Sequence, residues 1–94
     1  GEMETSMMMH IVPELVLPLT EAGKGSDRKF RPEGLRKKWA WAQREWTKVT
    51  RDTGIGNPAK ATPEKGERFL SVLCRTIADF LIELDKTPND EIYE

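Results

Sequence analysis

TPEKGERFLSVLCRTIADFLIELDK, residues 62–86, predicts the longest element of the chain, an amphipathic helix. Thr62 can accept a hydrogen bond as the N-cap, Pro63 suits the first helical position, and Glu64 places negative charge where the helix dipole favours it. Pro88 predicts that the helix ends at about residues 85–87. Apolar residues at helical spacing predict one broad hydrophobic face, made of Phe69, Leu70, Leu73, Cys74, Ile77, Phe80, Leu81 and Leu84.

A second, shorter helix is predicted near the start of the chain, over about residues 2–11. Glu2 and Glu4 lie in its first turn, where free backbone amides and the helix dipole favour negative charge. Its apolar run ends at Pro13, which lacks a backbone donor and disfavours helix at the residue before it. A rotation of about 200° over two residues points the two carboxylates to different sides. Glu4 lies on the apolar side, where a carboxylate needs a partner such as a metal ion.

The segment between the helices is predicted to be mixed. Residues 14–19 are expected to form a short extended edge segment between prolines, and residues 20–29, rich in Gly, Lys and Ser, a surface loop. Aromatic and β-branched side chains in residues 39–50 favour a strand. An amphipathic helix over residues 32–46 is the alternative, because four apolar residues there follow helical spacing. Residues 52–58 predict a turn-rich loop.

Composition limits the classes of protein to which the chain can belong. Its 94 residues make at most one small domain, and with 37% hydrophobic and 33% charged residues the core is expected to be small or shared with a partner. A net charge of −1 argues against nucleic-acid binding. No apolar run approaches the roughly 18 residues that span a bilayer, so no membrane partner is expected. The single cysteine fits a reducing compartment, the cytoplasm.

Several other reactive side chains are interpreted as packing residues. The four methionines near the N-terminus are more typical of core or interface filling than of thioether metal ligands, and His10 is more typical of a packed side chain than of a ligand. Trp39, Trp41 and Trp46 favour buried packing or a subunit contact over a carbohydrate or cyclic-substrate pocket. Cys74 lies on the apolar helix face, which favours a buried, inert thiol over a nucleophile.

Two ordered motifs resemble the C-terminal motifs of the creatininase family. GEMETSMMMHIVPELV, residues 1–16, resembles a family pattern in which His-Ala-Gly, two variable positions and Glu-Thr-Ser precede Pro-Glu-Leu-Val. DTGIGNP, residues 52–58, followed by ATPEKGER, residues 61–68, resembles the family stretch before its final helix. Gly1 matches the glycine after His-Ala, and Glu4 matches the glutamate of Glu-Thr-Ser. The resemblance therefore identifies residues 1–94 as a C-terminal fragment or processed chain of one such domain.

The resemblance implies a fold, a chemistry and a set of partners. The fold would be α/β, the C-terminal part of a three-layer α/β/α sandwich, with a motif helix, a strand or loop region and a long closing helix. The enzyme would be a metal-dependent hydrolase, often a homohexamer, with a divalent site of two Zn or Mn ions. Glu4 would be the catalytic and metal-binding residue of this chain, as a direct ligand or beside one. The remaining ligands would come from the N-terminal portion of the same enzyme.

The substrate implied by the resemblance is a small cyclic molecule. The segment Trp39–Trp46 and the acidic ending at residues 90–94 resemble family members that act on keto-inositols, more than members that open creatinine, a cyclic amide; deformylases come third. The competing interpretation is a non-catalytic interaction subunit with an exposed Trp-rich surface. It predicts a stable folded monomer without metal, whereas the hydrolase interpretation predicts neither.

Overall fold

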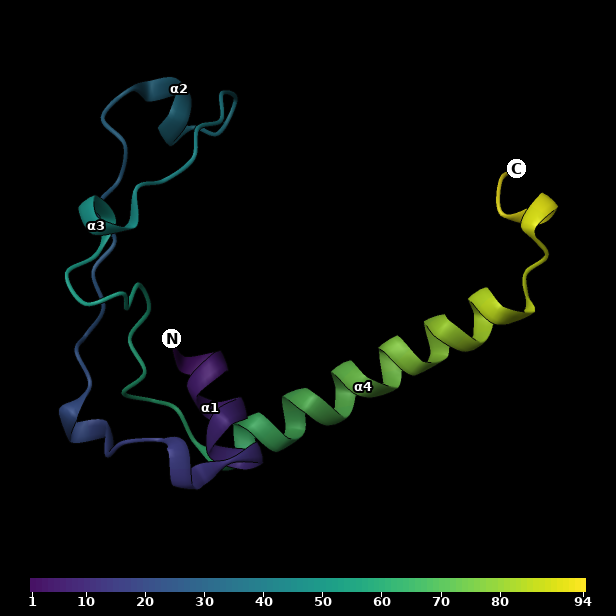
Figure 1. Cartoon of the computed structure of the whole chain (residues 1–94), viewed down its shortest axis with the longest axis horizontal. Coiled ribbons are helices and arrows are strands. Elements are labelled where there is room, and N and C mark those ends of the chain that lie inside the picture. Colours follow the sequence, from purple (N-terminus) through teal and green to yellow (C-terminus); the bar gives the residue numbers. More distant parts are fainter.

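The longest element is α4, Pro63–Lys86, in a computed structural model that describes residues 1–94. It begins as expected: Pro63 occupies the first turn, and the Thr62 hydroxyl accepts a hydrogen bond from the Lys65 amide at 3.2 Å. It ends at Lys86, within the predicted limits and just before Pro88. Figure 1 shows that α4 projects away from the rest of the chain along most of its length.

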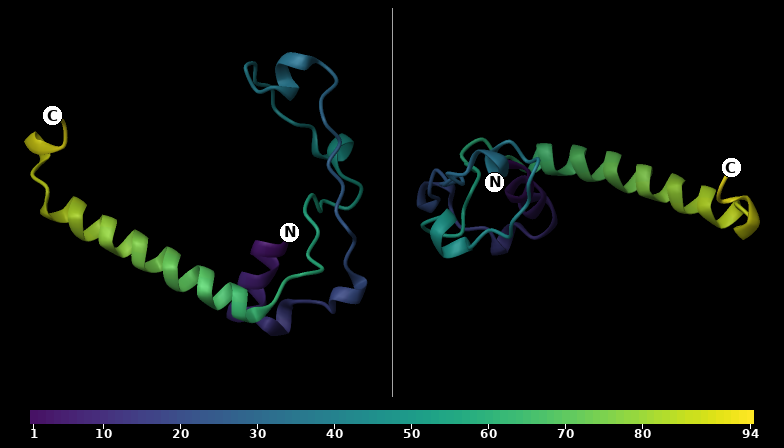
Figure 2. Two further views of the ribbon diagram at one scale, coloured as in Figure 1. Left: turned by 180° about the vertical axis from the view of Figure 1, so that it is seen from behind. Right: turned by 90° about the horizontal axis from the view of Figure 1, so that it is seen from above.

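The first helix is also confirmed, as α1, Glu2–Ile11. The amide of Val12 closes its last turn on the Met8 carbonyl at 2.9 Å, immediately before Pro13. α1 packs against α4 and against the short turn that follows it. The views in Figures 1 and 2 agree that α1 lies beside the beginning of α4.

All remaining elements are single turns. Between α1 and α4 the chain runs outward, reverses and returns alongside itself (Figure 1). Two backbone hydrogen bonds join the outgoing and returning segments, from the Ser26 amide to the Gly54 carbonyl and from the Arg28 amide to the Val49 carbonyl, each 2.9 Å. These turns are η1 (Pro13–Leu15), η2 (Leu19–Glu21), α2 (Glu33–Arg36), α3 (Trp46–Val49) and η3 (Asn89–Glu91).

The strand expected over residues 39–50 is wrong, because the chain forms no strand, and the alternative long helix is wrong as well. Two isolated bonds to a neighbouring segment make no ladder, and a strand without one leaves its backbone groups unpaired. Lys38 also has a φ of 63°, which turns the chain out of an extended path. Of the short extended segment expected at residues 14–19, the two ends lie in the 3-10 turns η1 and η2, and residues 16–18 between them lie in no turn, with Val16 extended. The three-layer sandwich stays a prediction for the whole domain.

Burial is confined to two places. Only five of 94 residues are buried, and the radius of gyration is 18.8 Å, against about 13 Å for a compact chain of this size. Ser6, Ala61 and Gly66 are buried where α1 crosses the start of α4, and Val49 and Thr50 where the returning segment meets the outgoing one. The expected small core is therefore confirmed, and it holds only the beginning of α4.

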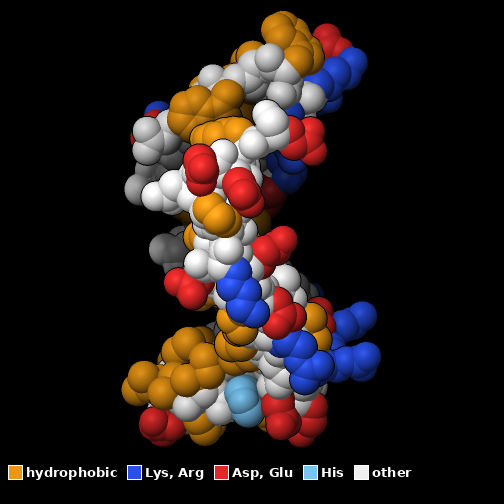
Figure 3. Space-filling model, turned by 90° about the vertical axis from the view of Figure 1, so that its right-hand side faces the viewer, with side chains coloured by type: hydrophobic (Ala, Val, Ile, Leu, Met, Phe, Trp, Pro, Cys, Tyr) orange, Lys and Arg blue, Asp and Glu red, His pale blue; other side chains and the backbone are white.

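Most side chains expected to be buried are exposed. Trp39 and Trp41 are 77% and 85% exposed, and His10 and Cys74 are exposed as well, so the expected burial within the chain is wrong, while a subunit contact of the tryptophans stays a prediction. The reason is that no second layer covers the apolar face of α4 or the outer loop. Figure 3 accordingly shows large hydrophobic areas at the surface, between scattered charged side chains. No helix is both long enough and apolar enough to cross a membrane.

Candidate functional site

Glycines allow three segments to approach one another closely at the N-terminus of α1: the first residue, the outgoing segment around Gly25 and the loop at residues 52–58. A Cβ on Gly56 would lie 3.0 Å from the Cα of Gly1, so the loop at residues 52–58 touches the first residue of the motif. Gly25 has a φ of 78°, and a Cβ there would lie 2.3 Å from the Ile55 carbonyl oxygen. No larger residue fits either approach without displacement of backbone. Gly1 and Gly56, 55 positions apart in sequence, thus bring the two motifs together at one end of α1.

Glu4 is presented at this end of α1, largely to solvent. Its side chain is 63% exposed, and its Oε2 lies 3.1 Å from the Gly1 nitrogen. The pKa of Glu4 is lowered, chiefly by a hydrogen bond from its own backbone amide. Glu4 is therefore an ionised carboxylate. The spacing had predicted that Glu4 lies on the apolar side of α1, but its side chain is not buried there.

Glu2 is held on a different side of the helix, as the 200° rotation predicts. Its Oε1 lies 2.5 Å from the Nζ of Lys65, which also donates to the Lys60 carbonyl oxygen at 2.7 Å. The hydrogen bond from Lys65 is the main cause of a lowered pKa at Glu2. Of the two carboxylates in the first turn, Glu2 thus forms an ion pair with Lys65 of α4, whereas Glu4 faces away from α4.

A cavity of about 410 Å³ opens beside Glu4. Thr5 and Met8 of α1 contribute to one wall, the segment Leu15–Leu19 forms another, and Pro58 comes from the turn-rich loop. Its lining is mostly apolar, and Glu4 and Glu21 are the only charged side chains in it. A carboxylate at the rim of an apolar cavity is the arrangement expected of a small-molecule site.

The crossing of α1 and α4 is held by residues to which the sequence had assigned no role. The Ser6 hydroxyl donates to the Glu2 carbonyl at 2.6 Å and accepts from the Thr62 amide at 3.1 Å. A Cβ on Gly66 would lie 1.9 Å from the Ser6 carbonyl oxygen, so the two backbones touch there. The available signal was Gly66 itself, because glycine inside an amphipathic helix costs stability unless a close contact requires it.

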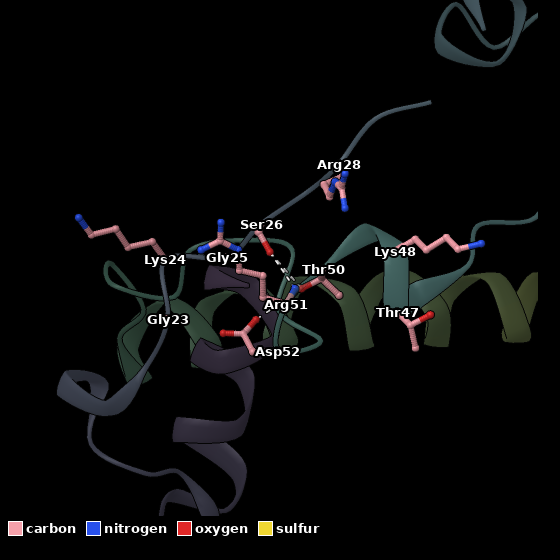
Figure 4. Close-up of a pocket in the computed structure, with 10 residues that line it drawn as sticks. All are labelled: Gly23, Lys24, Gly25, Ser26, Arg28, Thr47, Lys48, Thr50, Arg51 and Asp52. Atoms are coloured by element: carbon pink, nitrogen blue, oxygen red, sulfur yellow. Dashed lines mark hydrogen bonds between the residues drawn. The ribbon is translucent and has the colours of Figure 1, made fainter. Parts of the chain in front are cut away.

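A second, larger cavity of about 980 Å³ lies between the outgoing and returning segments (Figure 4). Its lining is polar, and a hydrogen-bond network through Ser26, Thr50 and Asp52 holds one wall. Four cationic side chains border it, but Lys24 and Lys48 point outward in opposite directions (Figure 4). The cations do not converge on one point, so we assign no ligand to this cavity.

The residues present can supply only part of a metal centre. An ionised, exposed carboxylate such as Glu4 is a suitable oxygen ligand for a divalent ion. However, no three His, Cys, Asp or Glu side chains of the chain come together in a group that could hold an ion. Within this chain Glu4 therefore belongs to no group of three such side chains.

Comparison with known proteins agrees with this arrangement. Residues 1–81 match the creatininase family, described as creatinine amidohydrolase. A crystal structure of a "Putative creatinine amidohydrolase" from Bacteroides fragilis NCTC 9343 superposes with a TM-score of 0.87 at 46% sequence identity. The match covers 100% of this chain and 36% of that one, so the chain spans about a third of the length of its relative. No curated protein sequence matches the chain.

The family match includes both α1 and α4 up to Leu81, and the structural match extends over every turn between them. The two sequence motifs, their contact through Gly1 and Gly56, and the overall course of the chain thus lead to one conclusion. The chain belongs to the creatininase family.

Proposed function

We propose that the chain is the C-terminal part of a metal-dependent hydrolase that opens a small cyclic substrate with metal-activated water. The observation that carries the proposal is the separation of the two carboxylates at the start of α1. Lys65 binds Glu2, whereas Glu4 is exposed at the rim of an apolar cavity. Membership of a family described as creatinine amidohydrolase supports the same chemistry.

In this proposal Glu4 is a metal ligand, or a carboxylate hydrogen-bonded to one. When bound, a pair of Zn or Mn ions would polarise the attacked group and lower the pKa of a water molecule. The role of this chain is to hold the ionised carboxylate of Glu4 at a fixed position on α1, as an oxygen ligand. The apolar wall formed by Leu15–Leu19 excludes water from one side of the cavity and fits the ring of a small substrate.

The chain is proposed to act together with the N-terminal portion of the same domain. The chain covers 36% of its relative, which leaves most of that protein's length to supply further ligands and packing surface. The exposed apolar face of α4 supports this partner, because large hydrophobic areas on a helix are normally covered. Assembly into a homohexamer in the cytoplasm is proposed on the family resemblance.

We propose a keto-inositol as the first substrate class and a cyclic amide of the creatinine type as the second. The resemblance of the segment Trp39–Trp46 and of the acidic ending at residues 90–94 supports the first class. The name of the Bacteroides relative supports the second. Turnover assays of the complete enzyme with one compound of each class, at equal concentration, separate the two.

One observation favours a second candidate, a non-catalytic interaction subunit. Trp39, Trp41 and Trp46 are 77%, 85% and 56% exposed, and exposed tryptophans are typical of binding surfaces. This candidate predicts a stable folded monomer without metal. The intact mass and metal content of the purified protein decide between the candidates: a metal-loaded sample that contains an N-terminal portion supports the hydrolase, and a metal-free monomer supports the interaction subunit.

The test of the catalytic proposal is Glu4→Gln in the enzyme that contains the whole domain. We expect loss of bound metal by elemental analysis and a fall in kcat of at least about 100-fold, since an amide is a much poorer metal ligand than a carboxylate. The matched control is Glu2→Gln in the same turn, where the side-chain amide oxygen can still accept the hydrogen bond from Lys65 that holds α1 to α4. Full metal content and turnover in Glu4→Gln would contradict the proposal.

A further inference from the structure

Ser6 is the one buried residue of α1, with 2% of its surface exposed. Its hydroxyl donates to the Glu2 carbonyl oxygen and accepts from the amide of Thr62, 56 residues further along the chain. Thr62 is the N-cap of α4, so this one oxygen joins the first turn of α1 to the residue at which α4 begins. Thr62 is half-buried, and an amide that loses its partner where water has little access is costly, so the link constrains the two turns.

Two more contacts hold the same pair of turns together. Gly66 touches the backbone of Ser6, and the ammonium group of Lys65 binds the carboxylate of Glu2. Both residues belong to the first turns of α4, and the two residues that they contact flank Glu4 by two positions on either side. The motif at the start of α4 therefore holds the motif at the start of α1, on both sides of the proposed metal ligand.

We propose that Ser6 is a positioning residue for Glu4. The elements that α1 contacts are α4 and η1, which follows it directly in the chain, and Gly1 at its start touches Gly56 of the turn-rich loop. Together with the Gly66 contact and the Lys65–Glu2 pair, the hydrogen bond between Ser6 and the Thr62 amide therefore fixes the rotation of α1 relative to α4. A metal ligand must be placed to within about 0.2 Å, so a small rotation of α1 moves the Glu4 carboxylate out of range.

This inference rests on the proposed function, because it takes Glu4 to belong to the metal centre. The test is Ser6→Ala in the enzyme that contains the whole domain, with metal affinity measured by chelator competition. Loss of an interaction that orients a ligand typically weakens metal binding about 10–100-fold, and we expect an effect of that size. We also expect kcat to fall more than KM rises, because the substrate walls keep their own contacts.

Thr62→Ala is the matched control. It removes the oxygen that caps the Lys65 amide, but it leaves the Thr62 backbone amide to donate to Ser6. Both variants should lower the melting temperature by a similar amount, whereas only Ser6→Ala should weaken metal binding. If Ser6→Ala does not fold, Ser6→Cys keeps the side-chain shape with a weaker hydrogen-bonding group, and it should still bind metal less tightly.

The outcomes separate this inference from the proposed function. Equal metal affinity in Ser6→Ala and Thr62→Ala would overturn the positioning role and leave the hydrolase proposal standing. Full affinity in Ser6→Cys, where Ser6→Ala is unfolded, would also overturn it. A wild-type enzyme that binds no metal would overturn the proposed function, and the positioning role with it.

Discussion

At the scale of single residues, backbone approach matters more than side-chain packing in this chain. Gly1 and Gly56 touch, and Gly66 lies against Ser6, so two of the tightest contacts between the motifs involve atoms that no side chain can replace. Gly56 and Gly66 are needed because a second segment of backbone occupies the space where a Cβ would be.

Gly66→Ala tests this directly. Alanine is a better helix former than glycine by about 1 kcal/mol. Its Cβ would, however, lie 1.9 Å from the Ser6 carbonyl oxygen, and opening an overpacked contact costs about 1–3 kcal/mol or more. We therefore expect net destabilisation by urea denaturation followed by circular dichroism. Ser71→Ala, at an exposed position of the same helix, should change stability by less than about 0.5 kcal/mol. A Gly66→Ala protein as stable as the wild type would contradict the contact.

At the scale of elements, the outer loop between η2 and α3 depends on one carboxylate. Asp27 pairs with Lys29 and with Arg44, which also donates to the Arg28 carbonyl oxygen at 3.1 Å. These pairs tie the outgoing segment to the return of the chain just before α3. With no strand ladder and few buried residues, this ionic contact holds together a loop that carries two exposed tryptophans.

The loop should therefore respond to acid. Hydrogen bonds from Lys29 and then Arg44 hold the pKa of Asp27 below its ordinary value of 3.8. A lowered pKa contributes stability that is fully present above the ordinary value and is lost as pH falls through the lowered one. We expect tryptophan emission to change only below pH 3.8. Asp27→Asn should show the changed emission already at neutral pH, and Glu33→Gln, in the exposed pair with Lys37, should behave as wild type. Wild-type emission in Asp27→Asn would refute the role of the pair.

At the scale of the whole molecule, most of α4 extends beyond α1, the one other element that packs against it. From residue 71 to Lys86 every residue is exposed, and the apolar face that includes Ile77 and Leu84 contacts no other part of the chain. Burial of such a face contributes about 25 cal/mol per Å² removed from water, so a partner surface is favoured strongly. The proposed N-terminal portion of the domain is the natural partner, and its absence should make the 94-residue chain self-associate.

Neighbouring residues on α4 allow a matched test. Leu81 belongs to the apolar face and Ile82 to the opposite side, yet they are 54% and 53% exposed. In sedimentation of the 94-residue chain, we expect Leu81→Glu to reduce self-association and Ile82→Glu to leave it nearly unchanged, since only the first places a charge in the buried contact. Equal effects of the two substitutions, or a wild-type chain that is monomeric and folds cooperatively, would argue against this interface.

Signals that act within a few residues determined α1, α4 and the turn-rich loop from the sequence alone. Pro13, Pro63 and the Thr62 cap set helix ends through backbone geometry that depends on no distant contact. The different directions of Glu2 and Glu4 followed from helix rotation in the same way. The exposure of Glu4 was not foreseen, because which side of α1 is covered depends on what packs there.

Only the tertiary structure decided how the motifs meet. The bond between Ser6 and Thr62 and the pair of Glu2 with Lys65 join residues 56 and 63 positions apart, and no local preference encodes such a pairing. The same reason accounts for the missing strand at residues 39–50, since strand propensity needs a neighbouring strand before it takes effect. Local capping and periodicity thus determined the two helices, and long-range contacts between the start of α1 and the start of α4 decided how the two helices meet.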